Sequence, residues 1–86
     1  MDINQLISIV KKKIKGNISV EKIKIEDKTF LHKKHKFHKI GKFHLKLLIQ
    51  SEELKKLDKI KSTKKIYQIL NEELKKYIHS IQILIS

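Results

Sequence analysis

The 86-residue sequence contains no cysteine, no proline, no tryptophan and no arginine, and it has only two glycines. Without cysteine, neither a disulfide bond nor a thiolate metal site can stabilise the fold. The same absence fits a reducing compartment, and we expect the protein to be cytoplasmic. Without arginine, the chain lacks the planar side chain that binds guanine through two hydrogen bonds, which weakens a nucleic-acid interpretation of its charge.

Long hydrophobic runs are also missing. Runs such as LLI and ILI are far too short to cross a bilayer. The N-terminal stretch MDINQLISIVKKKIK places its lysines after the apolar residues, which is the reverse of a signal peptide. We therefore expect no membrane insertion, and we interpret residues 1–86 as one small domain that is monomeric when free.

Positive charge is abundant. The chain has 21 lysines against nine acidic residues, which gives a formal net charge of +12. Such an excess suggests an acidic partner, whether nucleic acid, an anionic membrane surface or an acidic protein. Lysine and isoleucine are both used heavily, however, and an AT-rich genome produces that bias without selection for binding. The charge by itself indicates a basic protein and does not identify its partner.

The first part of the chain predicts a helix followed by two strands. Asp2 is a typical N-cap residue, and Gln5 completes a capping box with it. An apolar stripe with helical spacing follows, and Gly16-Asn17 ends the helix. Residues 18–26 alternate as a strand does, and residues 43–50 alternate more clearly still.

The second part of the chain predicts two helices and a final strand. Ser51 caps a short helix, residues 58–61 form a joint, and a longer helix runs from about Ser62 to Tyr77. The last strand covers residues 79–86. The predicted order is αββααβ, an α+β fold in which three helices cover one face of a three-stranded mixed sheet.

The loop between the first two strands, about residues 27–41, is rich in lysine and carries His32, His35 and His38. Strands joined by a loop are most simply antiparallel, whereas strands joined through helices return in parallel. The third strand then starts at the same end of the sheet as the second. This topology predicts that His79 lies beside the loop histidines, and that the resulting histidine edge is the functional site.

Each histidine also has a structural interpretation. The loop histidines are then solvated side chains, and His79 caps the start of its strand. His44 alternates away from the apolar face of its strand, and we interpret it as an exposed or half-buried sheet residue rather than a ligand. The three-residue spacing in the loop defines no zinc geometry, and the neighbouring lysines oppose a divalent cation.

Four stretches of the sequence carry a resemblance to a known family. They are EDKTFLHKKH at 26–35, KFHLKL at 42–47, IY at 66–67 with NEEL at 71–74, and YIHSI at 77–81. In this order they resemble the BolA family over essentially the whole chain. The last stretch stands where that family typically has Ile/Val-His-Ala-Leu. The resemblance implies a fold similar to a type II KH domain.

The resemblance also implies a non-enzymatic adaptor in iron–sulfur cluster assembly, trafficking or iron-linked regulation. BolA-like proteins pair with monothiol glutaredoxins carrying a Cys-Gly-Phe-Ser motif, and the two proteins share a [2Fe–2S] cluster together with glutathione. By position, His79 matches the family's ligand at the start of the last strand, and His32 or, alternatively, His35 matches the loop ligand. Lys64 and Tyr67 belong to the implied partner-binding face. The cluster is expected only in the complex.

A nucleic-acid-binding transcriptional regulator is the alternative function, based on the charge and on the KH-like fold. Two departures weaken it. Ser62-Thr63-Lys64 replaces an Arg-His-Arg stretch of many relatives, and the chain has no Gly-X-X-Gly loop of the kind that holds a nucleic-acid backbone.

An enzyme is not expected, because the sequence contains no recognisable catalytic grouping, phosphate-binding loop or paired carboxylates.

Overall fold

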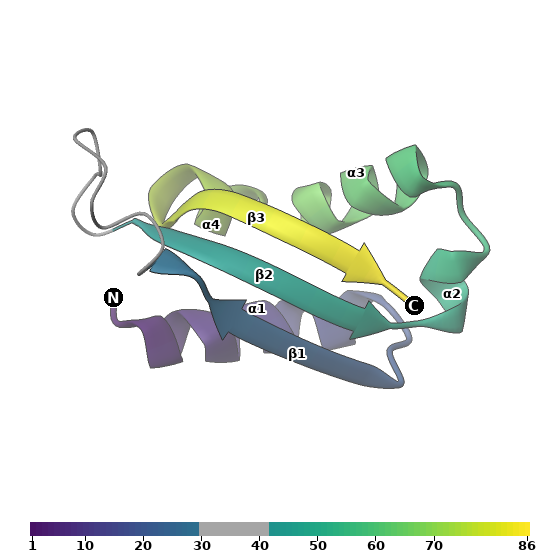
Figure 1. Cartoon of the computed structure of the whole chain (residues 1–86), viewed down its shortest axis with the longest axis horizontal. Coiled ribbons are helices and arrows are strands. Elements are labelled where there is room, and N and C mark those ends of the chain that lie inside the picture. The colour runs from purple at the N-terminus through teal and green to yellow at the C-terminus, as the bar shows by residue number, and fades with distance from the viewer. Residues whose placement is uncertain (30–41) are drawn as a thin grey trace.

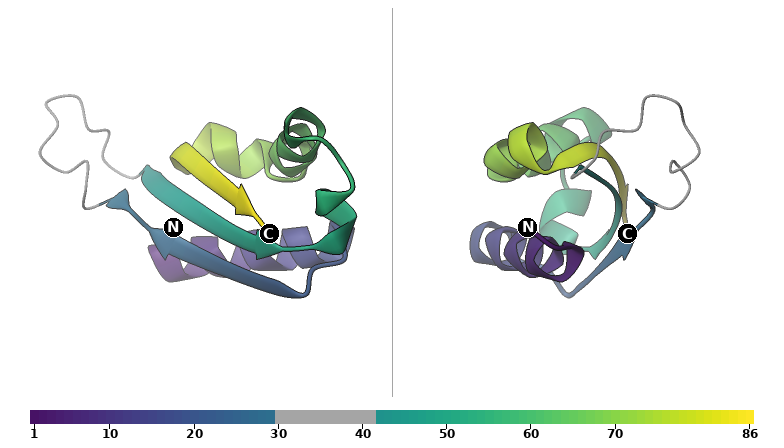
Figure 2. Two further views of the ribbon diagram at one scale, coloured as in Figure 1. Left: turned by 45° about the vertical axis from the view of Figure 1, so that its right-hand side comes forward. Right: turned by 90° about the vertical axis from the view of Figure 1, so that its left-hand side faces the viewer.

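The computed structural model describes residues 1–29 and 42–86, and it arranges a three-stranded sheet with helices on one face (Figures 1 and 2). The elements in chain order are α1 (Ile3–Asn17), β1 (Lys22–Asp27), β2 (Phe43–Gln50), α2 (Glu52–Lys55), α3 (Lys59–Ile69), α4 (Asn71–Lys76) and β3 (Ile78–Ile85). The α+β class and the helices on a single face of the mixed sheet are as the sequence predicts.

The first helix begins and ends where the sequence predicts. The Asp2 carboxylate accepts a hydrogen bond from the Gln5 backbone N–H at 2.8 Å, and the Gln5 side chain accepts one from the Asp2 N–H at 3.1 Å. This capping box satisfies two donors that the helix cannot satisfy internally. The buried face of α1 consists of Leu6, Val10 and Ile14, spaced four residues apart. It packs the helix against the sheet.

The strand order is β1-β2-β3, so β2 is central. β1 pairs with β2 in the antiparallel sense, and β2 pairs with β3 in parallel, which confirms the predicted topology. The central residue Leu47 is fully buried and lies between Ile25 and Ile83 in the register. These side chains face the helices and form the core together with Leu6, Val10, Ile14, Ile18, Leu45, Ile49, Leu54, Ile66, Leu70 and Ile78.

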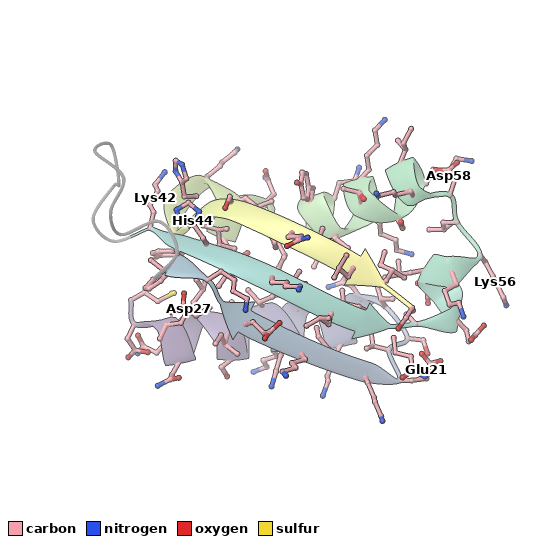
Figure 3. The ribbon with its side chains drawn as sticks, in the orientation of Figure 1. Glu21, Asp27, Lys42, His44, Lys56 and Asp58 are labelled. Atoms are coloured by element: carbon pink, nitrogen blue, oxygen red, sulfur yellow. The ribbon has the colours of Figure 1, made fainter. Side chains whose placement is uncertain are left out.

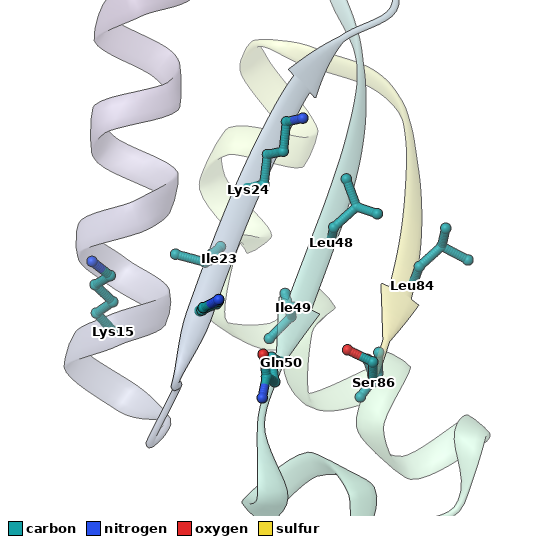
Figure 4. A pocket seen from close by; sticks show the side chains of 10 residues that line it. Lys15, Ile23, Lys24, Leu48, Ile49, Gln50, Leu84 and Ser86 are labelled. Atoms are coloured by element: carbon teal, nitrogen blue, oxygen red, sulfur yellow. The ribbon is translucent and has the colours of Figure 1, made fainter.

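On the opposite face of the sheet, no helix is formed by residues 1–29 or 42–86 (Figure 2). Leu48 pairs with Leu84 across β2 and β3, and both side chains lie on this open face (Figure 4). Lys24 lies beside them on β1 and shares a shallow pocket with them. The alternation of Leu47 and Leu48 between a covered and an open face follows from the two-residue period of a strand.

Three boundaries differ by more than one residue from the sequence prediction. β1 begins at Lys22 rather than at residue 18, because the Ile18 N–H still donates to Ile14 O at 2.9 Å and closes the end of α1. Residues 58–61 are not a joint: Asp58 caps α3, accepting a hydrogen bond from the Lys61 N–H at 2.8 Å. The longer predicted helix is divided at Leu70, whose φ and ψ of −99° and 18° leave the helical region.

A partly buried ion pair ties α4 to α1. Lys13 Nζ lies 2.7 Å from Glu73 Oε2, and Glu73 is only 5% exposed. The hydrogen bond to Glu73 raises the pKa of Lys13 above its ordinary value of 10.5, so this lysine stays charged at neutral pH. Because α4 leads directly into β3, this contact helps to hold the start of the last strand in place.

A second ion pair links α3 to α2. Lys65 Nζ lies 3.0 Å from Glu53 Oε2, and Glu53 Oε1 also accepts a hydrogen bond from the Ser19 N–H at 3.2 Å. The hydrogen bond from Lys65, followed by that from Ser19, lowers the pKa of Glu53 below its ordinary value of 4.5. The short helix α2 is therefore attached both to α3 and to the segment that enters β1.

Candidate functional site

Two histidines meet at the end of the sheet where β2 and β3 both begin. His44 is the second residue of β2 and His79 is the second residue of β3. Because the two strands are parallel, their starting ends lie side by side. The imidazole ring centroids are 4.9 Å apart, and the ring planes make an angle of 62° in an edge-to-face arrangement. Figure 3 shows His44 beside the start of β3.

An irregularity in the strand pairing exposes His79. Phe43 pairs with Ile78 and His44 pairs with Ser80, so His79 is an extra residue in β3 with no partner of its own in the register. Strict alternation with Ile81 would turn His79 toward the helices. The bulge instead buries Ile78, which is 2% exposed, and leaves His79 exposed. The signal in the sequence was the three-residue step from Ile78 to Ile81 in an otherwise alternating strand.

His44 is held from several sides. Its Nδ1 atom lies 2.6 Å from Ser80 Oγ, and its backbone N–H donates to Thr29 Oγ1 at 3.1 Å. The His44 carbonyl accepts a hydrogen bond from the Lys28 N–H at 2.7 Å. Thr29 is in turn hydrogen-bonded to the Asp27 carboxylate through both its backbone N–H and its hydroxyl group. These contacts join the end of β1 to the start of β2 beside the histidine pair.

The sequence prediction for His44 was wrong in its burial. Its side chain does alternate away from the core residues Leu45 and Leu47, as expected. It is nevertheless buried, at 7% exposure, and the His79 ring packs against it. In an isolated amphipathic strand this side chain would be exposed, but the neighbouring strand β3 contributes His79 and Ser80 to the same rim.

The loop histidines His32, His35 and His38 lie outside the described residues, so their place beside His79 stays a prediction. The flanking residues do lie at the predicted end of the sheet. The Phe43 N–H donates to Tyr77 O at 2.9 Å, immediately before β3, and Lys42 Nζ lies 3.4 Å from Lys75 O on α4. The topological part of the prediction, that β3 starts at the same end as β2, is therefore confirmed.

The donor set of this site limits what it can bind. Imidazole nitrogen is a ligand for zinc, copper, nickel and iron. Within residues 1–29 and 42–86, no three His, Cys, Asp or Glu side chains come together in a group that could hold a metal ion. Two imidazoles at an edge fit a metal centre that another molecule completes, and they do not suffice for a closed four-ligand site.

The two residues of the predicted partner-binding face lie on α3. Lys64 is exposed and Tyr67 is 44% exposed, and both line a shallow pocket together with Gln68 and Asn71. Figure 1 shows α4, rather than α3, beside the start of β3. The structure therefore presents Lys64 and Tyr67 on the surface of a helix that is separate from the histidine rim.

No helix in the described part of the chain has the length and hydrophobicity needed to span a bilayer.

Comparison with known proteins assigns the chain to a family. The family described as "BolA-like protein" matches residues 14–86. A protein of Haemophilus influenzae named "DNA-binding transcriptional regulator BolA" is 32% identical over 73 residues, which cover 85% of this chain and 68% of the relative.

Solved structures of similar proteins share the fold. The BolA domain of SufE1 from Arabidopsis thaliana superposes with a TM-score of 0.79 at 21% identity, covering 100% of this chain and 93% of that domain. BolA1 from the same plant gives a TM-score of 0.76 at 22% identity, covering 91% and 86%. A bol-like protein from Babesia bovis gives 0.70 at 14% identity, covering 91% and 79%.

Proposed function

The chain belongs to the BolA-like family, and from this premise we propose that it is a non-enzymatic adaptor that pairs with a monothiol glutaredoxin and shares a [2Fe–2S] cluster with it. The observation that supports the proposal is the contact between the His44 and His79 rings at one rim of the sheet, where the ring centroids are 4.9 Å apart. The complex would serve iron–sulfur cluster assembly, trafficking or iron-linked regulation, and this protein would hold the cluster only in the complex.

The ligand count is consistent with this proposal. Each iron of a [2Fe–2S] cluster takes four ligands, and the two bridging sulfides leave two places on each iron. Two neutral imidazoles fill the places on one iron in Rieske-type centres. In this protein His79 and His44 would fill them, while His32 and His35 remain the alternatives that the sequence predicts for the second place. A chain without cysteine can therefore still hold one side of the cluster.

The remaining ligands would come from the partner. The glutaredoxin cysteine and glutathione would supply thiolates to the second iron. The net charge of +12 attracts a partner with an acidic surface and offsets the negative charge of a thiolate-ligated cluster. Lys64 and Tyr67, both exposed on α3, are the residues that we assign to the protein–protein contact.

Substituting His79 tests the proposed function. The protein, a monothiol glutaredoxin and reduced glutathione are mixed under anaerobic conditions, and the shared cluster is followed by visible absorption and circular dichroism. We expect His79→Ala to remove the spectrum of the mixed complex, because one iron loses a ligand. Gln82→Ala, an exposed change on the same strand, is the control and should leave that spectrum unchanged. A wild-type spectrum from His79→Ala would exclude His79 as a ligand.

Binding of nucleic acid is the second candidate function, because the Haemophilus influenzae relative carries the name of a DNA-binding transcriptional regulator. The positive charge of this chain is compatible with that role. All of the charge is carried by lysine, however, which binds phosphate as a point charge and does not form the bidentate contact that distinguishes bases.

We expect the protein to bind duplex DNA without sequence preference and with a steep dependence on salt. Fluorescence anisotropy with several unrelated duplexes, from low salt to about 0.15 M, the physiological ionic strength, measures both properties. Equal affinities that are lost at the higher salt would identify non-specific attraction to lysine. An affinity for one duplex that stays well above the others at about 0.15 M would favour the regulator over the adaptor.

A further inference from the structure

Ser80 lies against the buried histidine of the site. Its hydroxyl oxygen is 2.6 Å from His44 Nδ1, within hydrogen-bond distance. The two residues are direct partners in the parallel register of β2 and β3. Ser80 itself is exposed, so its hydroxyl hydrogen can point to solvent while the oxygen accepts a hydrogen bond from the ring.

The bulge at His79 creates this contact. In a regular register, with Phe43 still opposite Ile78, His79 would pair with His44 and Ser80 would pair with Leu45. The extra residue moves Ser80 opposite His44 and moves His79 out to the rim. One irregularity in β3 therefore exposes one imidazole and brings a hydroxyl group to the other.

A hydrogen bond at one ring nitrogen decides which nitrogen of a neutral imidazole carries the proton. We propose that Ser80 is a positioning residue, which accepts the Nδ1 proton of His44 and so leaves the coordinating lone pair on Nε2. This inference rests on the proposed function for its biological meaning, because it assumes that His44 is a metal ligand. The hydrogen bond itself is a property of the protein without a cluster.

The other contacts of His44 restrict the orientation of its ring. The residue is 7% exposed, and the His79 ring packs against the His44 ring edge to face. Its backbone is fixed to Thr29 and to Lys28. Rotating the ring by half a turn would replace Nδ1 with a carbon atom opposite Ser80 and would lose the hydrogen bond. Ser80 thus selects one orientation in a space where the ring is already confined.

Residues that orient a metal-binding histidine affect the metal strongly. Removal of such a hydrogen-bond partner typically lowers metal affinity by about 10–100-fold. Ser80→Ala should therefore weaken retention of the shared cluster by a factor in that range, about 10–100-fold. Because Ser80 is exposed, this substitution opens no cavity in the core, so the fold should be unaffected.

The first test uses the cluster-free protein. Long-range proton–nitrogen NMR spectra report which ring nitrogen of His44 is protonated, at about pH 8, above the ordinary imidazole pKa of about 6.5. We expect the wild type to show the proton on Nδ1, Ser80→Ala to show a mixture of both forms, and Ser80→Thr to restore the Nδ1 form because it keeps the hydroxyl group. Gln82→Ala is the control and should match the wild type.

The second test separates this inference from the proposed function. The same variants are mixed with glutaredoxin and glutathione, and cluster retention is compared with that of His79→Ala. An Nδ1 proton in Ser80→Ala as in the wild type would overturn the role of Ser80, whatever the protein does. A changed tautomer in Ser80→Ala with cluster retention equal to that of the wild type would overturn the role of Ser80 in holding the cluster. If the wild-type protein itself formed no shared cluster with glutaredoxin, the proposed function would be overturned instead, and the tautomer result would still stand.

Discussion

Replacing His44 with alanine should abolish the shared cluster, whereas His32→Ala and His35→Ala should leave it in place. His44 is the imidazole that contacts His79, with ring centroids 4.9 Å apart, and it is oriented by Ser80. Two ligands on the same iron must lie close together, and this pair meets that condition. The loss should be at least as large as the roughly 10–100-fold effect of removing a residue that only orients a ligand.

The measurement is the visible circular dichroism of the complex with glutaredoxin and glutathione. Because His44 is buried, alanine leaves a gap, and unfolding of the variant has to be distinguished from loss of a ligand. His44→Gln, which keeps a polar side chain of intermediate size, is the second variant, and far-ultraviolet circular dichroism reports the fold of both. Loss of the cluster in His32→Ala or His35→Ala, with retention in folded His44→Gln, would return the second ligand to the loop.

Leu47→Ala should destabilise the protein by about 2–5 kcal/mol, the usual range for truncating a fully buried leucine. Leu47 is 0% exposed at the centre of the middle strand, where it packs between the helices and the flanking strands. Domains of this kind have a total free energy of unfolding of roughly 5–15 kcal/mol. A single core substitution would therefore remove a large part of the stability.

Leu48→Ala is the matched control, because it makes the same change at the next residue of the same strand. Leu48 lies on the open face of the sheet beside Leu84 (Figure 4), where truncation should cost about 1 kcal/mol or less. Urea denaturation of both variants measures the difference, and an unchanged m-value shows that the same surface is exposed on unfolding. Equal losses would mean that both faces of the sheet are covered, contrary to the structure.

Much of the fold follows from local patterns. The capping box of Asp2 and Gln5 marks the start of α1, and the alternation of residues 43–50 identifies β2. The parallel return of β3 follows from a general rule about connections through helices, so that the meeting of the starting ends of β2 and β3 was also predictable. The boundaries at Asp58 and Leu70 were predicted wrongly because the local signals are weak. Asp58 is a cap residue without an apolar stripe directly behind it, and Leu70 marks a short bend within one apolar stripe.

The candidate site was only partly predictable. His79 was identified, and its position at the start of β3 was correct. His44 was set aside because its own strand gives it a polar, outward position, and its burial depends on residues far along the chain. The contact with Ser80 required knowledge of the register, and a one-residue change in register exchanges the two faces of a strand.

The sequence alone is therefore enough to locate most of the helices and strands, because periodicity and capping act between residues a few positions apart. It also predicts which ends of β2 and β3 lie together, because a connection through helices returns the chain in parallel. The tertiary structure alone decided that β3 bulges at His79, and hence which imidazole is exposed, which is buried and which hydroxyl group faces it. The reason is that register is set by packing between distant segments. Because Ile78 and Ile81 both turn toward the core, one residue of β3 between them has to leave the ladder. That residue is His79, which lies between Ile78 and Ser80 and has no partner in β2.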